Sequence, residues 1–376
     1  MTNAWEKMAQ EALGEEEPKR YLKVIRASDI GMEATCWTWE DDAGKWLPQG
    51  EVSLIAGREG VGKSTVTADL VAKLTRGLLP GEHFGTPKHV IICATEDSWR
   101  QTINPRLSAA GADLSKVIRV EAYTPEGLEG VLQLPEDIEE IRRIAAEHDV
   151  VLIVLDPLMS TLSSKLNPHV DAEVRRGLEP LSRLAHTSDL AVIGLIHENK
   201  SNATDLLSRI MGSRAFAAVV RAVLYCANRE LDEDDTKPDE FGQRPPRQFV
   251  FGQAKSNLGK QVPFAIRYTI DGTEVGWDDK KGRAIWSSRI VWGATEDQSI
   301  QDIIREQESQ RTTKKSEAKT WLKEYLDGKG EIPVDTLMKA AEAEGHTRST
   351  IQRARGLLRV AIRPAGKSTT WSLLEK

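Results

Sequence analysis

The 376-residue chain is poor in the residues that define several protein classes. Its three cysteines, Cys36, Cys93 and Cys226, are far apart and form no CxxC or Cys/His spacing, so we predict neither a zinc site nor a disulfide framework. No stretch approaches the roughly 18 consecutive apolar residues of a membrane-spanning helix, and the polar N-terminus lacks the apolar core of an export signal. We therefore expect a chain of the reducing cytoplasm without a membrane partner.

The chain also lacks an excess of positive charge. Its net charge is −6 and its pI is about 5.8, which argues against a protein that coats nucleic acid over its whole surface. The charge is unevenly distributed, because residues 312–376 carry 13 Lys and Arg against 8 Asp and Glu, which leaves −11 for the rest. With 40% apolar residues, the chain is long enough for about two domains, of which the C-terminal one is basic.

Hydrophobic patterning predicts the organisation of the chain. Residues 1–34 are polar and acidic, and we expect a flexible lead-in. From about residue 50 to 270, β-branched runs alternate with helical patterns such as those at 63–75 and 174–185, which predicts an α/β domain with a mostly parallel central sheet, placed over residues 35–294. The expected strands are 52–56, 89–94, 117–122, 150–155, 190–196, 222–226 and 248–253, with the acidic residues 230–240 as a hairpin loop between the last two.

The C-terminal part has a different pattern. Residues 295–315 are highly polar and read as a helical linker between two domains. Helical patterns then cover 316–326, 334–344 and 348–359, and a short hairpin follows. Three helices and a hairpin predict a winged helix-turn-helix domain over residues 316–376.

A phosphate-binding motif stands between an apolar run and a periodic helix. Residues 57–64, GREGVGKS, match G-x-x-x-x-G-K-[ST]. Backbone N–H groups of such a loop curl round a phosphate, Lys63 places its charge on the β- and γ-phosphates, and Ser64 supplies a Mg²⁺ ligand. We predict ATP and Mg²⁺ as cofactors. The expected nucleotide-binding residues are Gly57, Glu59, Gly60, Val61, Gly62, Lys63, Ser64 and Thr65.

Polar residues follow three of the other expected strands, at the edge where open α/β sheets bind ligands. Asp156 follows the run VVLIVL and is expected to bind the metal with Ser64. Glu96 follows the strand at 89–94 and is the expected general base, with Asp97 as the weaker candidate and as a helix cap in the alternative. His197 follows the strand at 190–196 and could sense the γ-phosphate.

The order of these motifs resembles the RecA-like P-loop ATPases of the plasmid and phage replicative hexameric helicases of RepA type. The resemblance covers about residues 35–270 and is carried by GREGVGKST, ATED, VLIVLDP, LIHENK, MGSRAF and QAKSNLG. It implies a ring in which ATP lies between subunits. In such a ring Arg221 corresponds to an arginine finger that acts on the neighbouring subunit, Lys255 to a second cation in trans, and Arg214 could replace either.

The resemblance also implies where DNA binds. The loops after the fourth and fifth expected strands would line the pore, with Lys165, Lys200 and Arg209 as their cations. The C-terminal domain lies outside this resemblance, and there the winged-helix pattern itself predicts that the third helix and the wing contact duplex DNA or a replication protein. Its expected DNA-contacting residues are Arg348, Arg353, Arg355 and Lys367, beside Arg363. Trp277, Trp286 and Trp292 are expected in the core rather than in a base-stacking platform.

The leading hypothesis is an ATP hydrolase that acts as a homohexameric, ATP-driven translocase on single-stranded DNA, as in a replicative helicase of a phage or mobile element. A RecA-type recombinase or a loader of helicase or other protein uses the same core and stays open. A third alternative, from another class, is a DNA-binding regulator or partition protein in which bound nucleotide acts only as a switch.

Overall fold

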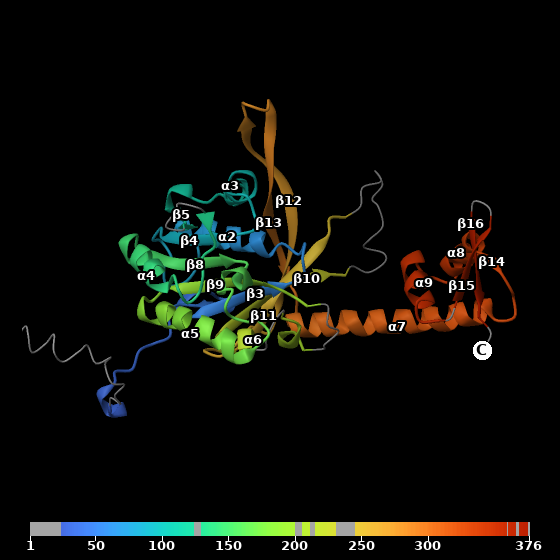
Figure 1. Cartoon of the computed structure of the whole chain (residues 1–376), viewed down its shortest axis with the longest axis horizontal. Coiled ribbons are helices and arrows are strands. Elements are labelled where there is room, and N and C mark those ends of the chain that lie inside the picture. Colours follow the sequence, from blue (N-terminus) through green and yellow to red (C-terminus); the bar gives the residue numbers. More distant parts are fainter. Residues whose placement is uncertain are drawn as a thin grey trace, which may run out of the picture. The chain divides into compact units, whose positions relative to one another are not determined.

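The structure is a computed structural model that describes residues 24–123, 129–199, 205–210, 215–230, 245–358, 360–365 and 368–374 (Figure 1). The chain divides into two units, residues 1–35 and 36–376. In the first, the structure describes a single turn of 3₁₀-helix, η1 (Ala27–Asp29), whose residues are all exposed. Within the described residues, no helix is both long and apolar enough to cross a membrane.

The second unit is built on a nine-stranded sheet with the order β13-β12-β11-β10-β3-β9-β8-β4-β5. The strands from β10 to β5 run parallel, and β11, β12 and β13 are added antiparallel at one edge. All seven expected strands lie in this sheet, which confirms the predicted α/β fold with a mostly parallel sheet. The strands are β3 (Val52–Gly57), β4 (His89–Ala94), β5 (Val117–Arg119), β8 (Val150–Asp156), β9 (Ala191–His197), β10 (Ala222–Arg229), β11 (Gln248–Ser256), β12 (Ala265–Asp278) and β13 (Arg283–Thr295).

Helices cover both faces of the sheet because its central strands are apolar on both sides. On one face α2 (Lys63–Thr75) and α3 (Asn104–Ala110) pack with the base of the β12–β13 hairpin. On the other face lie α4 (Ile138–Glu147), α5 (Asp171–Thr187), α6 (Ala215–Val219) and the first turns of α7 (Ile300–Leu326). The sheet's carboxyl edge, where β3, β4, β8 and β9 end, is thereby held between two packed layers.

Smaller elements complete this unit. A hairpin of β1 (Trp37–Asp41) and β2 (Gly44–Pro48) stacks Trp39 and Trp46 near Phe251 of β11. The expected strand at 117–122 breaks after Arg119, and Ala122 begins a separate two-residue strand. The remaining short elements are β6 (Ala122–Tyr123), β7 (Glu129–Gly130), the π-turn η2 (Trp99–Ile103), and the 3₁₀ turns η3 (Leu114–Lys116), η4 (Leu158–Thr161) and η5 (Leu207–Arg209).

The C-terminal residues form a second core of their own. It comprises the end of α7, β14 (Ile332–Pro333), α8 (Val334–Ala343), α9 (Arg348–Arg355), β15 (Val360–Ala365) and β16 (Ser368–Leu373), with the antiparallel sheet order β14-β16-β15. Leu322, Leu337, Ile351 and Trp371 are buried in this core. The expected linker and the helix expected at 316–326 are one continuous helix, α7, which begins with Ile300 and Ile303 buried against the large sheet.

The expectation that three tryptophans lie in the core is wrong for two of them. Trp277 and Trp286 are 58% and 64% exposed on the outer part of the β12–β13 hairpin. This part projects from the sheet because β12 pairs with β11 only as far as Tyr268 in the described chain, and beyond it β12 and β13 pair with each other (Figure 1). Trp292, nearer the base, packs in the large core and its indole N–H donates to Asp69 of α2 at 2.8 Å.

Candidate active site

The phosphate-loop motif connects the end of β3 to the start of α2, as predicted. Gly57 has φ +149°, and a Cβ on it would lie 2.2 Å from the carbonyl oxygen of Cys226 on the neighbouring strand. Gly62, directly before the helix, has φ +86°, and a Cβ there would meet Ile270 of β12 at 2.5 Å. Both positions favour glycine for their backbone conformation, and Gly57 also for space, because its neighbour is a backbone oxygen rather than the end of a flexible side chain. The loop is therefore fixed in a tight curve that ends at a helix N-terminus, where anions are favoured.

Lys63 lies at the centre of this curve and is 7% exposed. Its ammonium donates to the carbonyl oxygens of Gly57 at 2.9 Å and Arg58 at 3.0 Å. Its Nζ also lies 3.3 Å from Nδ1 of His197 at the end of β9. Burial lowers the pKa of Lys63, and the charge of nearby Asp156 opposes that shift. The loop thus places a buried cation where a phosphate would be held.

Ser64 and Asp156 meet as the motif predicts. The Ser64 hydroxyl donates to Asp156 Oδ2 at 2.8 Å. Burial raises the pKa of Asp156, and the hydrogen bond from Ser64 partly opposes this. Mg²⁺ is usually bound through one or two such protein oxygens together with substrate phosphates. The two side chains therefore fit a Mg²⁺ ion that is shared with a nucleotide.

Glu96 and His197 line the same cleft, which has a volume of about 350 Å³. They come together because β4, β8, β9 and β3 are parallel and in register, with Ala94 beside Asp156 and Gly57 beside His197. The cleft is lined by Glu59, Gly60, Gly62, Lys63, Ser64, Thr65, Glu96, Asp97, Arg106, Asp156, His197, Ile270 and Ser288. Six of the eight expected nucleotide-binding residues are among them. Gly57 supplies a carbonyl to Lys63, and Val61 is buried in the core below the loop.

The alternative role of Asp97 as a helix cap is wrong. Ser98 is the N-cap, and its side chain accepts from the backbone N–H of Gln101 in the π-turn that precedes α3. Asp97 instead pairs with Arg106 of α3 at 3.0 Å, within the cleft. Because a guanidinium already engages Asp97, Glu96 remains the expected general base of the two.

Arg221 and Lys255 lie together, but away from this cleft. Arg221 donates its N–H to Val52, the first residue of β3, and its guanidinium lies 3.7 Å from Glu51. The Lys255 ammonium donates to the carbonyl oxygens of Ala217 and Val220 at 2.7 and 2.8 Å. The phosphate loop follows the other end of β3, roughly 16 Å further along the strand. Neither cation therefore reaches the cleft of its own subunit.

The expected pore cations have different environments. Lys165 has an exposed side chain, 3.4 Å from Glu136. Arg209 is 2% exposed and pairs with Glu198 and with Glu308 of α7. A buried guanidinium held by two carboxylates does not present its charge to DNA, so the expectation for Arg209 is not met here. Lys200, and Arg214 of the trans alternatives, lie outside the described residues.

In the C-terminal core, Arg348 and Arg353 are exposed on α9. Arg355 is partly buried, with its guanidinium 5.0 Å from the centre of the Trp371 ring. Arg363 of β15 pairs with Glu331 at 2.6 Å, and Lys367 lies outside the described residues. The helix surface thus carries two freely accessible cations, while the other two described arginines have partners within the domain.

The sequence patterns missed the part of the site contributed by β12 and β13. The Tyr268 hydroxyl, on a residue 1% exposed, donates to the carbonyl oxygen of Val61 in the phosphate loop at 2.5 Å. Ile270 and Ser288 line the cleft from the same hairpin. The expected strands ended at residue 253, and no motif in residues 265–295 marks a contact with a loop more than 200 positions away. Arg106 of α3 was also missed, because no motif surrounds it and it joins the cleft through its ion pair with Asp97, nine positions earlier.

Two comparisons bear on this site. The sequence family described as the AAA domain matches residues 16–203, half of the chain, which include Lys63, Ser64, Glu96, Asp156 and His197. Over 210 residues the chain is 25% identical to the DNA repair protein RadA of Halalkalibacterium halodurans. That alignment covers 55% of this chain and 40% of RadA, so the chain spans less than half the length of this relative.

Proposed function

The chain belongs to the AAA-domain family of P-loop ATPases, and from this premise we propose that it is an ATP-driven, homohexameric translocase of single-stranded DNA that acts as a replicative helicase of a phage or other mobile element. The observation that carries the proposal is the cleft in which Lys63, the Ser64–Asp156 pair and Glu96 converge at the carboxyl edge of the sheet. In this proposal Lys63 is the cation, Ser64 and Asp156 are the metal ligands and Glu96 is the base that phosphoryl transfer to water needs.

Each side chain has a distinct role in the proposed hydrolysis. The backbone N–H groups of the loop and Lys63 would hold the phosphates, and Ser64 and Asp156 would hold Mg²⁺, which neutralises charge on the phosphate oxygens when it is bound. Glu96 would orient the attacking water and accept its proton. His197, 3.3 Å from Lys63, would respond to the phosphate that Lys63 binds.

The placement of Arg221 and Lys255 supports an assembly. Both are held at the opposite end of β3 from the phosphate loop, where they have no route to their own cleft. On a neighbouring copy the same surface could face the cleft and stabilise charge that develops on the γ-phosphate. A closed ring gives every cleft such a neighbour.

DNA is the proposed track. The relative named as a DNA repair protein supports a DNA-directed role for the ATPase. We propose that the three helices and the antiparallel sheet at the C-terminus are a winged helix, and that Arg348 and Arg353 on its α9 contact DNA phosphates or bases. Lys165 and Lys200 are the proposed pore cations.

A RecA-type recombinase or loader is the second candidate, and the similarity to RadA is the observation that favours it. The two candidates share the ATPase chemistry and differ in the assembly and in the reaction on DNA. A ring that separates a duplex indicates the helicase, whereas a filament that pairs strands, or a complex that delivers another protein, indicates the alternative.

Unwinding of a forked DNA duplex in the presence of ATP and Mg²⁺ tests the proposal. We expect the wild-type chain to separate the strands and Lys63→Ala to separate none. In electron micrographs we expect the wild-type chain to form rings of six subunits. Filaments and strand pairing without unwinding would replace the helicase with the second candidate. ATP turnover that is slow and indifferent to DNA would favour a regulator that nucleotide switches.

A further inference from the structure

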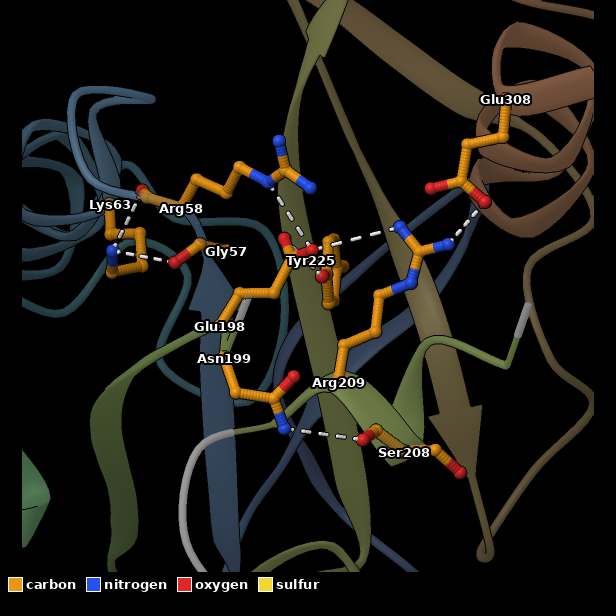
Figure 2. A network of polar contacts seen from close by, with 9 residues as sticks. All are labelled: Gly57, Arg58, Lys63, Glu198, Asn199, Ser208, Arg209, Tyr225 and Glu308. Atoms are coloured by element: carbon orange, nitrogen blue, oxygen red, sulfur yellow. Dashed lines mark hydrogen bonds and ion pairs between the residues drawn. The ribbon is translucent and has the colours of Figure 1, made fainter. Parts of the chain in front are cut away.

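A network of charged side chains, of which Glu198 and Arg209 are buried, lies beside the nucleotide cleft and centres on Glu198 (Figure 2). Glu198 directly follows His197, and its side chain is 4% exposed. Its Oε2 accepts a hydrogen bond from the Tyr225 hydroxyl at 2.7 Å. Its Oε1 lies 3.4 Å from Nε of Arg58 and 3.6 Å from Nη1 of Arg209. The carboxylate is therefore held by side chains from three separate parts of the chain.

The network reaches the phosphate loop on one side. Arg58 is the residue after Gly57, and its carbonyl oxygen is one of the two that hold the Lys63 ammonium. On the other side of Lys63 stands His197, whose backbone leads directly into Glu198. Glu198 is thus linked to the environment of Lys63 by two short routes, through its neighbour in the chain and through the side chain of Arg58.

The network reaches helix α7 on the other side. Arg209 has a side chain that is 3% exposed, and its second terminal nitrogen pairs with Glu308. One turn earlier on α7, Ile303 and Ile304 are buried in the main core. Gln307 accepts a hydrogen bond from the backbone N–H of Glu230 and donates to the carbonyl oxygen of Asn228 at 3.3 Å. Arg209 therefore bridges the start of α7 and the residue that follows His197.

We propose that Glu198 and Arg209 are positioning residues for ATP hydrolysis, because they fix the position of His197 and of the phosphate loop relative to helix α7. This inference rests on the proposed ATPase function and adds α7 to the parts of the molecule on which the reaction depends. Neither residue is among those that line the nucleotide cleft. Both act through Arg58 and through the backbone at His197.

The alternation of charges makes each member of the bridge depend on the others. Two arginines and two glutamates alternate along it, so each inner charge depends on both of its neighbours. Arg58 is the most accessible member, with a side chain that is 50% exposed. Its guanidinium faces Glu198 and is not part of the lining of the nucleotide cleft, so the network acts on the cleft through the backbone of Arg58, whose carbonyl oxygen holds Lys63.

The test compares Glu308→Gln and Arg209→Lys with the matched control Glu306→Gln, an exposed glutamate of the same helix whose carboxylate contacts Gln298 and Gln310. Glu308→Gln removes a charge at the rim of the network, and Arg209→Lys keeps the charge but loses the fork that spans two carboxylates. Steady-state ATP hydrolysis is measured well below the Tm of each variant, so that loss of folded protein does not enter.

We expect both variants to lower kcat by about tenfold while KM for ATP changes less than about threefold, because misplaced reacting groups slow the chemical step more than they weaken binding. The double variant should be no slower than Arg209→Lys alone, since both changes break one bridge. If Arg209→Lys does not fold, Glu308→Gln carries the test, because its carboxylate is 27% exposed.

Unchanged kcat in Glu308→Gln, or independent and additive losses in the two variants, would overturn the proposal while the wild-type chain still hydrolyses ATP. A change in KM alone would also count against it, because it would indicate weakened binding rather than misplacement. Absence of hydrolysis by the wild-type chain would overturn both this inference and the proposed function. The two failures are therefore distinguishable.

Discussion

Ser64 Oγ donates a 2.8 Å hydrogen bond to Asp156 Oδ2, across 92 positions of the sequence. The first residue begins α2 after the phosphate loop, and the second ends β8, which is separated from β3 in the sheet by β9. Parallel strands that end at one edge bring the two oxygens together, and a metal ion that binds one is within reach of the other. The pair supports the proposal that this edge binds nucleotide with Mg²⁺.

Loss of the Lys63 ammonium should remove most of the activity. We expect Lys63→Ala to lower kcat for ATP hydrolysis by about 100-fold or more, because a buried cation aimed at the developing phosphate charge is lost. The matched control is Lys73→Ala on the same helix, whose ammonium pairs with Asp69 at 2.9 Å away from the cleft. Near-normal turnover in Lys63→Ala would place the catalytic cleft elsewhere.

The buried Asp156 should lower the folding stability of the chain although ATP hydrolysis requires it. Burial raises its pKa above the usual value of an aspartate, so in the folded chain its ionised form is disfavoured relative to the unfolded chain. The penalty is fully present above the folded-state pKa and vanishes as the pH falls below the unfolded-state value. At neutral pH, Asp156→Asn should therefore have a higher Tm than the wild type in Mg²⁺-free buffer, and no ATP hydrolysis.

The pH dependence supplies the control for that prediction. Acidification toward the ordinary aspartate range should narrow the difference in Tm between the wild type and Asp156→Asn, because the wild-type carboxylate becomes protonated. Thermal melts over a series of pH values check this. A lower Tm for Asp156→Asn at neutral pH would mean that the ionised carboxylate stabilises the fold, contrary to the direction expected from its burial.

The phosphate loop should not tolerate a methyl group at Gly57. Gly57→Ala places a Cβ 2.2 Å from the Cys226 carbonyl oxygen and forces alanine to φ +149°, so we expect a loss of about 2–4 kcal/mol in the free energy of unfolding. The control is Gly272→Ala on β12, where no atom beyond the residue itself and its two chain neighbours lies within 4 Å of the added carbon in the described part of the chain. Chemical denaturation measures both. Equal stability of the two variants would contradict the geometry at Gly57.

The sequence predicted the parts of the site that depend on local order. Five predicted site residues directly follow or begin an element that the hydrophobic pattern identifies: Lys63, Ser64, Glu96, Asp156 and His197. Because the strands are parallel, such positions lie together at one edge of the sheet. It did not predict what long-range packing decides. The cover provided by Tyr268 and the burial of Arg209 against Glu308 depend on the β12–β13 hairpin and on α7, whose contacts carry no signal in a single sequence.

The tryptophans show the same limit in the opposite direction. Alternating aromatic residues in short strands usually face a core, and Trp292 does. Trp277 and Trp286 belong to the same two strands but lie where β12 and β13 have left the rest of the sheet. The alternation of residue types predicts which side chains share one face of a strand. The length of the neighbouring strands and helices decides whether that face is covered.

Action of Arg221 on a neighbouring subunit can be tested by mixing two inactive variants. Lys63→Ala has an inactive nucleotide cleft but keeps Arg221. Arg221→Ala keeps an intact cleft but lacks the arginine that would act on its neighbour. If Arg221 acts in trans, a hybrid interface that joins an intact cleft to an intact arginine should restore part of the hydrolysis. The control mixes each variant with more of itself. No gain in rate from the mixture, once hybrid assemblies are shown to form, would assign Arg221 a structural role beside Glu51.

We propose above all that single-stranded DNA stimulates ATP hydrolysis in the cleft of Lys63 and Asp156. The most direct measurement is the steady-state rate of ATP hydrolysis by the full chain with Mg²⁺, as unstructured single-stranded DNA is titrated at two salt concentrations. We predict a rate that rises about tenfold or more and saturates, with a midpoint that shifts to higher DNA concentration as salt increases. A rate that is unaffected by DNA at either salt concentration would contradict the account.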